Sequence, residues 1–295
     1  MSLTPEELRE LRRIHVAAGR RVDSLLSGDY RSAVRGRGME FEEVRAYVPG
    51  DDVRHIDWNV TARLNQPFIK QYVEERELTV MLVVDLSASG TFGSGRQTKR
   101  ELAAEVGAVL AFAAQRNNDK VGLTLFTERV EKYVAPAKGN RHVLRVVRDI
   151  LGHTPDHRGG DLRHALQHLQ KSFRRRSVMV LLSDFLDPLP ISTLQQARRR
   201  HDVVAIQITD PHEEQLPALG RMTLEDAETG EVGEVTLRSE EDLDAFFRHR
   251  AEAQDELEQQ FNGLGIDHIR LRTNEPFVPE LGRFFRTRLE RQRRT

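Results

Sequence analysis

LTVMLVVDLSAS, residues 78–89, joins an apolar, strand-like run to a polar loop, and the rest of the predicted fold follows from it. Residues 80–84 are all apolar and lack the alternation of polar and apolar side chains that marks a half-exposed strand. This pattern is typical of a parallel strand covered by helices on both faces. The run stops at Asp85, which is followed by Ser87 and Ser89. Because parallel strands carry ligand-binding residues at their carboxyl ends, we expect a carboxylate and two hydroxyls in one loop at the edge of a sheet.

The residues of this loop are open to two interpretations. One carboxylate and two hydroxyls, with space for water or for a partner's acid, are oxygen ligands of the kind that Mg²⁺ or Mn²⁺ accepts. Alternatively, Asp85 caps the helix that follows and the serines fill a turn, since Asp and Ser are common in both places. The stretch by itself does not separate a metal site from a structural turn.

The composition indicates a chain with a real core and no general affinity for polyanions. Its 295 residues suffice for one large α/β domain with an appendage, or for two modest domains. The 45 basic and 46 acidic side chains nearly cancel, so no global charge attracts nucleic acid or an anionic membrane. No apolar run approaches the roughly 20 residues that cross a bilayer, and the N-terminus lacks the apolar core of a signal peptide. The lack of cysteine excludes disulfides and thiolate metal sites, and we expect a cytoplasmic protein.

The N-terminal quarter of the chain predicts a surface helix followed by a small β-rich appendage. Residues 4–26 begin with Thr-Pro-Glu-Glu, a helix start, and continue with a charged, helix-compatible pattern. Residues 41–48 and 67–73 have strand-like patterns on either side of a Pro-Gly-Asp-Asp turn. We therefore expect two short strands ahead of the main domain.

Trp58, the only tryptophan, lies between these two strands, close to His55 and Asp57. We interpret the two polar residues as hydrogen-bonding neighbours of an apolar anchor rather than as ligands. Together with Val48, Ile56 and Leu64, Trp58 makes the segment too apolar for a solvated connector. The sequence therefore predicts that the segment packs against the main domain and that Trp58 is mostly buried.

Downstream of the first strand, helical and strand-like patterns alternate. We expect strands at 120–126, 130–134, 177–183, 203–209 and 266–271, helices at 97–115, 139–151, 161–173, 191–200, 240–261 and 279–291, and a short hairpin between 221 and 237. Such alternation implies βαβ crossovers. The predicted fold class is α/β, with a doubly wound, mostly parallel, Rossmann-like sheet.

The strand at residues 177–183 repeats the features of the first one, because it is another continuous apolar run and ends at Asp184. In the common strand order 3-2-1-4-5-6, these two strands are neighbours at the switch point where a crevice opens. Asp85 and Asp184 then converge with Ser87 and Ser89 at one edge of the sheet. This convergence favours the metal site over the structural turn.

These residues resemble the metal-ion-dependent adhesion site of a von Willebrand factor A domain. In that family a DxSxS loop, a threonine from a second loop and an aspartate after the fourth strand surround a divalent ion, and a partner's carboxylate completes the ligands. The resemblance implies that Asp85, Ser87, Ser89 and Asp184 hold Mg²⁺ or Mn²⁺.

The second loop departs from the pattern of that family. Where the family often reads Gly-Thr-Asp-Leu, residues 159–162 of this chain read Gly-Gly-Asp-Leu, so Gly160 stands in the threonine position. A water molecule or the nearby Asp161 would have to replace the hydroxyl. We therefore expect the ion to bind weakly.

A longer resemblance covers residues 47–63 and the acidic residues at 74–77. They resemble the signature of a bacterial family catalogued as domain of unknown function 58, whose members are typically encoded beside MoxR-type AAA+ ATPases. Many members begin with membrane-spanning helices, which this chain lacks, so a soluble version is implied. The resemblance implies a non-enzymatic adaptor or co-chaperone that binds such an ATPase and a client protein. It divides the chain into an N-terminal segment, a von Willebrand factor A-like domain and a basic C-terminal helix, at residues 1–76, 77–275 and 276–295.

Two functions of other classes compete with this interpretation. Asp85 could be the nucleophile of a phosphoryl-transfer or other Mg²⁺-dependent enzyme, although dehalogenase-type chemistry needs a second aspartate two residues later, where this chain has Ser87. Nucleic-acid binding would rest on short basic runs, but such runs are usually solvated helix ends. These runs are residues 174–176, 198–200 and 283–294.

Overall fold

The computed structural model describes residues 40–48, 51–64, 66–73, 78–214, 220–237 and 240–294. The helix expected at residues 4–26 lies outside them. The described residues belong to two compact units, one within residues 34–78 and the other within residues 79–295.

The smaller unit is built on the two predicted strands. β1 (Glu40–Ala46) and β2 (Phe68–Val73) pair antiparallel, and η1 (Val53–His55) and α3 (Trp58–Leu64) lie between them in the chain. The Asp57 side chain accepts hydrogen bonds from the Asn59 and Val60 N–H groups at the start of α3. Asp57 therefore has the structural role that the sequence indicates.

The expectation that Trp58 is mostly buried is wrong, because 71% of this residue is exposed. Val48 and Leu64 are each 56% exposed. A two-stranded ladder and a helix of seven residues form too small a core to enclose an indole, although Ile69 is buried. Apolar composition indicated burial here, but it does not say whether a surface is available to supply it.

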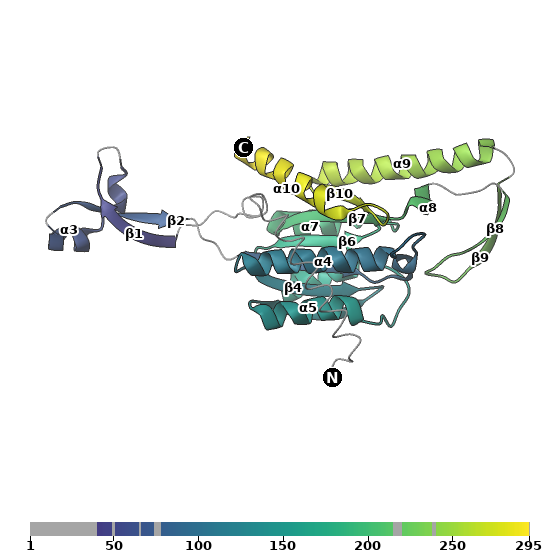
Figure 1. The fold of residues 1–295 in the computed structure, drawn as a ribbon, viewed down its shortest axis with the longest axis horizontal. Helices are drawn as coiled ribbons and strands as arrows, with labels where there is room; N and C mark the ends of the chain where they lie inside the picture. Colours follow the sequence, from purple (N-terminus) through teal and green to yellow (C-terminus); the bar gives the residue numbers. More distant parts are fainter. Residues whose placement is uncertain are drawn as a thin grey trace. The chain divides into compact units, whose positions relative to one another are not determined.

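The larger unit is built on a six-stranded sheet with the order β10-β7-β6-β3-β4-β5 (Figure 1). Neighbouring strands are parallel, except for β4 and β5, which are antiparallel. The strands are β3 (Thr79–Asp85), β4 (Lys120–Phe126), β5 (Val130–Ala137), β6 (Val178–Ser183), β7 (Asp202–Thr209) and β10 (Asp267–Arg272). The predicted α/β fold with a mostly parallel sheet is confirmed.

Helices pack on both faces of this sheet, and Figure 1 shows α4 and α5 side by side on one of them. A side chain at Gly107 of α4 would meet Ile150 of α5 at 3.2 Å and would lie 4.0 Å from Leu82 of β3. Met81 and Val83 point the other way, into a core cluster with residues of α6, α7 and α9. Because successive side chains of β3 enter two different cores, the strand is apolar without alternation.

The helices of the larger unit are α4 (Lys99–Arg116), α5 (Asn140–Gly152), α6 (Leu162–Ser172), α7 (Ile191–Arg200), α8 (Pro211–Glu214), α9 (Glu240–Leu264) and α10 (Phe277–Arg294). Of the helices in the described ranges, none is long and apolar enough to cross a membrane.

Two features of the topology position the candidate site. β3 and β6 are parallel neighbours with Val84 opposite Leu182, so the loops after both strands leave the same edge of the sheet, as the sequence predicted. β8 (Gly220–Glu225) and β9 (Val232–Leu237) form a separate antiparallel hairpin between α8 and α9. In Figure 1 the hairpin lies at the end of the sheet from which β7 leads into α8.

Candidate functional site

Asp85 lies at the end of β3 and is held by hydrogen bonds on both carboxylate oxygens. Oδ1 accepts from the Ser87 N–H at 2.8 Å, and Oδ2 accepts from the Ser183 hydroxyl at 2.7 Å. Burial and the nearby Asp184 raise the pKa of Asp85 to about 6, against the smaller effect of these hydrogen bonds. Asp85 does not cap α4, because Thr98 has that role through a capping box with Glu101.

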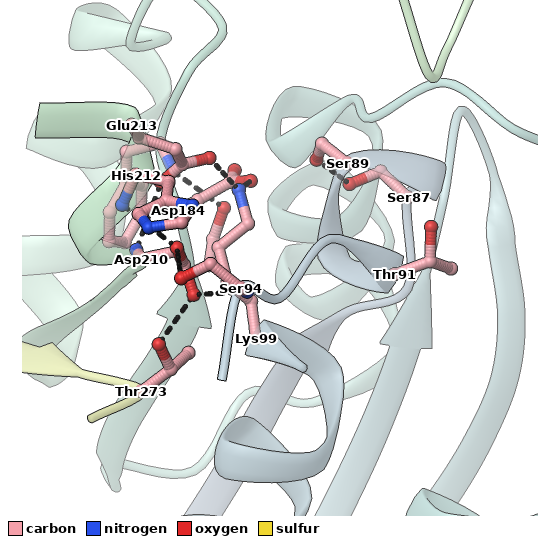
Figure 2. Close-up of polar contacts among 12 residues, drawn as sticks. Ser87, Ser89, Thr91, Ser94, Lys99, Asp184, Asp210, His212, Glu213 and Thr273 are labelled. Carbon is pink, nitrogen blue, oxygen red and sulfur yellow. Dashed lines mark hydrogen bonds and ion pairs between the residues drawn. The ribbon is translucent and has the colours of Figure 1, made fainter. Parts of the chain in front are cut away.

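Ser87 and Ser89 are both buried in the loop that follows Asp85, and their hydroxyl oxygens lie 3.0 Å apart (Figure 2). The structure therefore brings the three residues of the DxSxS pattern together. A hydroxyl that donates one hydrogen bond still has oxygen lone pairs available to a further ligand.

Asp184 is the neighbour of Asp85 across the strand ends, but a buried lysine already engages it. Lys99, at the first position of α4, is 2% exposed, and its Nζ lies 2.6 Å from Asp184 Oδ2. Figure 2 shows the same ammonium in contact with Glu213. Burial alone would lower the pKa of Lys99, but the two carboxylates outweigh it and raise the pKa.

Lys99 is a site residue that the sequence reasoning missed. Its position at the start of a helix could have indicated this role, because a cation in the first turn of a helix interacts unfavourably with the helix dipole. A lysine placed there needs acidic partners from elsewhere in the fold, here Asp184 and Glu213.

The residue after Asp184 has an unusual backbone. Phe185 adopts φ of +52°, a left-handed conformation that is uncommon for a bulky side chain. Its N–H donates to the Ser183 hydroxyl at 3.0 Å, and its ring packs edge-on against Phe261 at 5.2 Å between ring centroids. These contacts hold the turn after β6 in place.

A third aspartate, Asp210 after β7, ties neighbouring loops to this edge. It accepts hydrogen bonds from the Ser94 N–H and hydroxyl and from the Thr273 hydroxyl, the last at 2.6 Å (Figure 2). Burial tends to raise the pKa of Asp210, but these hydrogen bonds lower it overall. The Asp210 N–H in turn donates to Glu213, which steadies the acid that binds Lys99.

The loop that contains Gly160 lies beside Asp85 and Ser87. A Cβ at Gly160 would lie 3.5 Å from Ser87 Cβ, 3.7 Å from Asp85 Oδ2 and 3.0 Å from Asp187 Oδ2. Asp161 instead caps α6, with its Oδ1 accepting from the backbone N–H groups of the next helical turn and its Oδ2 lying 2.9 Å from His164 Nδ1.

A cavity of about 240 Å³ opens between these loops, and Asp85, Gly160, Asp161, Asp184 and Asp187 contribute to its walls. Burial and the nearby Asp184 raise the pKa of Asp187. The sequence reasoning missed Asp187, although its position three residues after Asp184 places it in the same loop.

Glu228, from the turn between β8 and β9, is the second acid that the sequence reasoning missed. Burial, followed by the charge of Asp187, raises the pKa of Glu228 to about 7, and the Gly160 N–H opposes this rise. Asp85 and Asp184 contribute to the same shift. No sequence pattern indicated it, because the hairpin folds back over a loop about seventy residues earlier.

Comparison with known proteins gives the chain a family. Residues 43–256 match the family described as Protein of unknown function DUF58. The chain belongs to this family. An uncharacterized protein of Mycobacterium tuberculosis (strain ATCC 25618 / H37Rv) is 33% identical over 287 residues, which cover 96% of this DUF58 chain and 90% of that protein. An uncharacterized protein of Mycobacterium bovis matches with the same identity and coverage.

Solved structures similar to this DUF58 chain include the conserved hypothetical protein BatB from Bacteroides thetaiotaomicron. It has a TM-score of 0.48 and 14% identity, over 72% of this chain and 99% of that chain. The SpRpn10 VWA domain has a TM-score of 0.41 and 12% identity, over 70% of this chain and 94% of that chain. Identities this low carry over no function.

The donor set of this DUF58 site suits a divalent cation in its chemistry. Asp85, Ser87 and Ser89 offer oxygen atoms, and the pKa values of Asp85, Asp187 and Glu228 are all raised in part by neighbouring carboxylates. A bound cation would relieve that repulsion. Within the described residues, no three His, Asp or Glu side chains are grouped so as to hold an ion on their own. An ion would therefore depend on the serine hydroxyls, on water and on a further acid.

Proposed function

We propose that the edge of the sheet around Asp85 is a protein-binding face, at which a weakly held Mg²⁺ or Mn²⁺ is completed by a partner's acidic side chain. The observation that supports this most is the meeting of Asp85, Ser87 and Ser89 in one loop, beside a cavity that Asp85 and Gly160 line. Oxygen donors of mixed charge at the end of a parallel strand are what a hard divalent ion accepts.

The charges around the site support weak binding of the ion by the protein alone. Lys99 already balances Asp184, and Asp85 accepts a hydrogen bond on each oxygen. Of the four residues expected to bind the ion, Asp85, Ser87 and Ser89 remain as oxygen donors that no lysine engages, and only Asp85 carries a charge. A partner carboxylate would supply the missing negative charge, so ion and partner would bind cooperatively.

The rim of this face carries apolar side chains suited to a protein contact. Leu186, in the loop after β6, is 50% exposed, and Phe92, in the loop after η2 (Ala88–Thr91), is 44% exposed. Apolar side chains around a polar centre are the usual composition of a protein interface.

We further propose that the protein is a non-enzymatic, cytoplasmic adaptor that links a MoxR-type AAA+ ATPase to a client protein. The family supports the ATPase partner through the resemblance described above. In the smaller unit, Trp58, Val48 and Leu64 are exposed apolar side chains to which an ATPase could dock. These side chains and the ion-binding face would allow one protein to hold two partners.

Titration calorimetry with Mg²⁺ tests the proposal. The wild-type protein should bind with a weak, measurable affinity, and Asp85→Ala should abolish the binding. Asp156→Ala is the matched control, because Asp156 is exposed and lies in the loop that contains Gly160. Equal binding by the wild type and Asp85→Ala would contradict the proposed site. Binding of a purified MoxR-type ATPase, weakened by Trp58→Ala and unaffected by Asp85→Ala, is the corresponding test of the ATPase contact.

A further inference from the structure

The β8–β9 hairpin presents open strand edges to solvent. Among the residues that the structure describes, β8 and β9 pair only with each other, so each strand has one edge without a partner strand. Apolar side chains of the hairpin are exposed, since Leu224 of β8 is 45% exposed and Val232 and Val235 of β9 are 65% and 37% exposed. An exposed strand edge is a template for pairing with another strand. Because two strands alone are marginally stable, further strands would stabilise the hairpin.

The backbone groups that point outward from β8 belong to alternate residues. The Asp226 N–H donates to the Glu231 carbonyl at 2.8 Å, so the backbone groups of Asp226 face β9. The register then continues without a shift along the whole of β8. Because the direction of these groups alternates along an antiparallel strand, those of Glu225, Thr223 and Arg221 point away from β9. Each of these three residues presents one N–H donor and one carbonyl acceptor along the edge.

This edge of β8 is complementary to a second copy of itself. When two β8 strands pair antiparallel about a two-fold axis at Thr223, Arg221 of each copy lies opposite Glu225 of the other. Opposite charges in facing positions stabilise a pair of strands, and so do two facing threonines. Arg221 Nε lies 3.5 Å from Glu234 Oε2 of β9, but the Arg221 side chain is still 72% exposed, so its guanidinium is accessible to a further acid. The same register pairs the outward backbone groups of all three residues.

The outer edge of β9 lacks this complementarity. By the same alternation, the residues of β9 whose backbone groups point outward are centred on Glu234. A symmetric pairing of two β9 strands over their full length therefore places Glu234 opposite Glu234 of the second copy. Like charges in facing positions destabilise a strand pair. Of the two edges, β8 is the one suited to self-pairing.

We infer that β8 is a self-association edge, at which two copies of this chain join their hairpins into one antiparallel sheet. The order of the joined sheet is β9-β8-β8-β9, and the two-fold axis runs between the β8 strands. Leu224 and Val235 share the opposite face of the hairpin from Arg221 and Glu225, and the second copy adds its own Leu224 to that face. One pair of strands is a small contact, so the dimer is weak and forms at high protein concentration. The inference does not depend on the proposed ion-binding face.

Sedimentation velocity over a series of protein concentrations tests the association. The wild-type protein should dimerise as its concentration rises. Glu225→Arg should raise the dissociation constant at least about tenfold, because each of the two facing pairs changes from attraction to repulsion. Glu231→Arg is the matched control, since it makes the same change of charge in the exposed turn of the hairpin and should leave the dissociation constant unchanged. A wild type that stays monomeric at every concentration, or equal dissociation constants for the wild type and Glu225→Arg, would overturn the inference.

Exchanging the two charges separates a direct contact from general damage to the hairpin. The double variant Arg221→Glu with Glu225→Arg should dimerise to within about threefold of the wild type, because opposite charges face each other again. The lost contact of Arg221 with Glu234 is exposed and contributes little. A double variant that dimerises no better than Glu225→Arg would contradict the proposed register.

Hydrogen exchange at low and high protein concentration locates the contact. The amides of Arg221, Thr223 and Glu225 should exchange quickly in dilute protein and slow down as the dimer forms, because their N–H groups then donate to the second copy. The Leu224 amide faces β9 and should exchange at the same rate at both concentrations. Dimerisation without any slowing at Thr223 would place the contact elsewhere and overturn the inference.

Discussion

Replacing Lys99 by methionine removes one buried ammonium and keeps most of the apolar stem. Lys99 is 2% exposed, and the carboxylates of Asp184 and Glu213 are 8% and 15% exposed. Without the ammonium, two acids remain close together in a site that water reaches poorly. Removing one partner of a buried ion pair typically costs about 3 to 5 kcal/mol. This is a large share of the roughly 5 to 15 kcal/mol that stabilises a domain, so we expect Lys99→Met to lower the free energy of unfolding by about 3 to 5 kcal/mol.

Urea unfolding followed by circular dichroism measures this loss. Lys171→Met, an exposed lysine of α6, is the control and should change stability by less than about 0.5 kcal/mol. The double variant Lys99→Met with Asp184→Asn should be less destabilised than Lys99→Met alone, because one of the two unbalanced charges is gone. Mg²⁺ should stabilise Lys99→Met more than it stabilises the wild type, because Asp184 becomes available to the ion.

The proposed role of the Lys99 ammonium is refuted if Lys99→Met lowers the free energy of unfolding by less than about 1 kcal/mol, since the ammonium would then not balance Asp184 and Glu213. It is also refuted if the double variant is less stable than Lys99→Met alone. A variant with the expected loss but no extra response to Mg²⁺ would show that Asp184 does not face the ion.

Gly160→Thr should tighten Mg²⁺ binding by about threefold to tenfold, because a hydroxyl replaces an ordered water. The new Cβ would lie 3.0 Å from Asp187 Oδ2, so this carboxylate must move slightly. A stable variant that binds Mg²⁺ no better by calorimetry would contradict the prediction. His201 has its pKa lowered to about 4 by burial and by Arg200. Because the unfolded chain takes up a proton at about pH 6.5 and the folded protein does so near pH 4, stability should fall as the pH drops through this range. His201→Gln should flatten that part of the urea-stability profile, and parallel profiles for the two proteins would show that His201 does not contribute. Trp58 is 71% exposed, so Trp58→Ala should change the free energy of unfolding by less than about 1 kcal/mol, and iodide should quench the fluorescence of the parent readily; a loss of about 3 kcal/mol would mean that the indole is buried.

The sheet and the meeting of its strand ends were predictable because both follow from short-range patterns. Residues 80–84 and 178–182 are continuous apolar runs, a pattern that is typical of a strand covered on both faces. The polar residue that ends each run then marks the edge of the sheet. Asp85, Ser87 and Ser89 follow each other in one loop, so their proximity needed no knowledge of the rest of the fold.

The remaining site residues depend on contacts that no local pattern encodes. Lys99 meets Asp184 across eighty-five positions of the chain, and Glu228 meets Gly160 only because a hairpin folds back over the sheet edge. The prediction that Trp58 is buried failed for a different reason. A large apolar side chain is buried only where a surface exists to cover it. The exposure of Trp58 could not be derived from composition.

Crystals grown with Mn²⁺ would test the central claim most directly, through the anomalous scattering of the metal. We expect one anomalous peak within bonding distance of Asp85, Ser87 and Ser89 in the wild-type protein, and none there in Asp85→Ala. Full Mn²⁺ occupancy at other residues, with none beside Asp85, would contradict it.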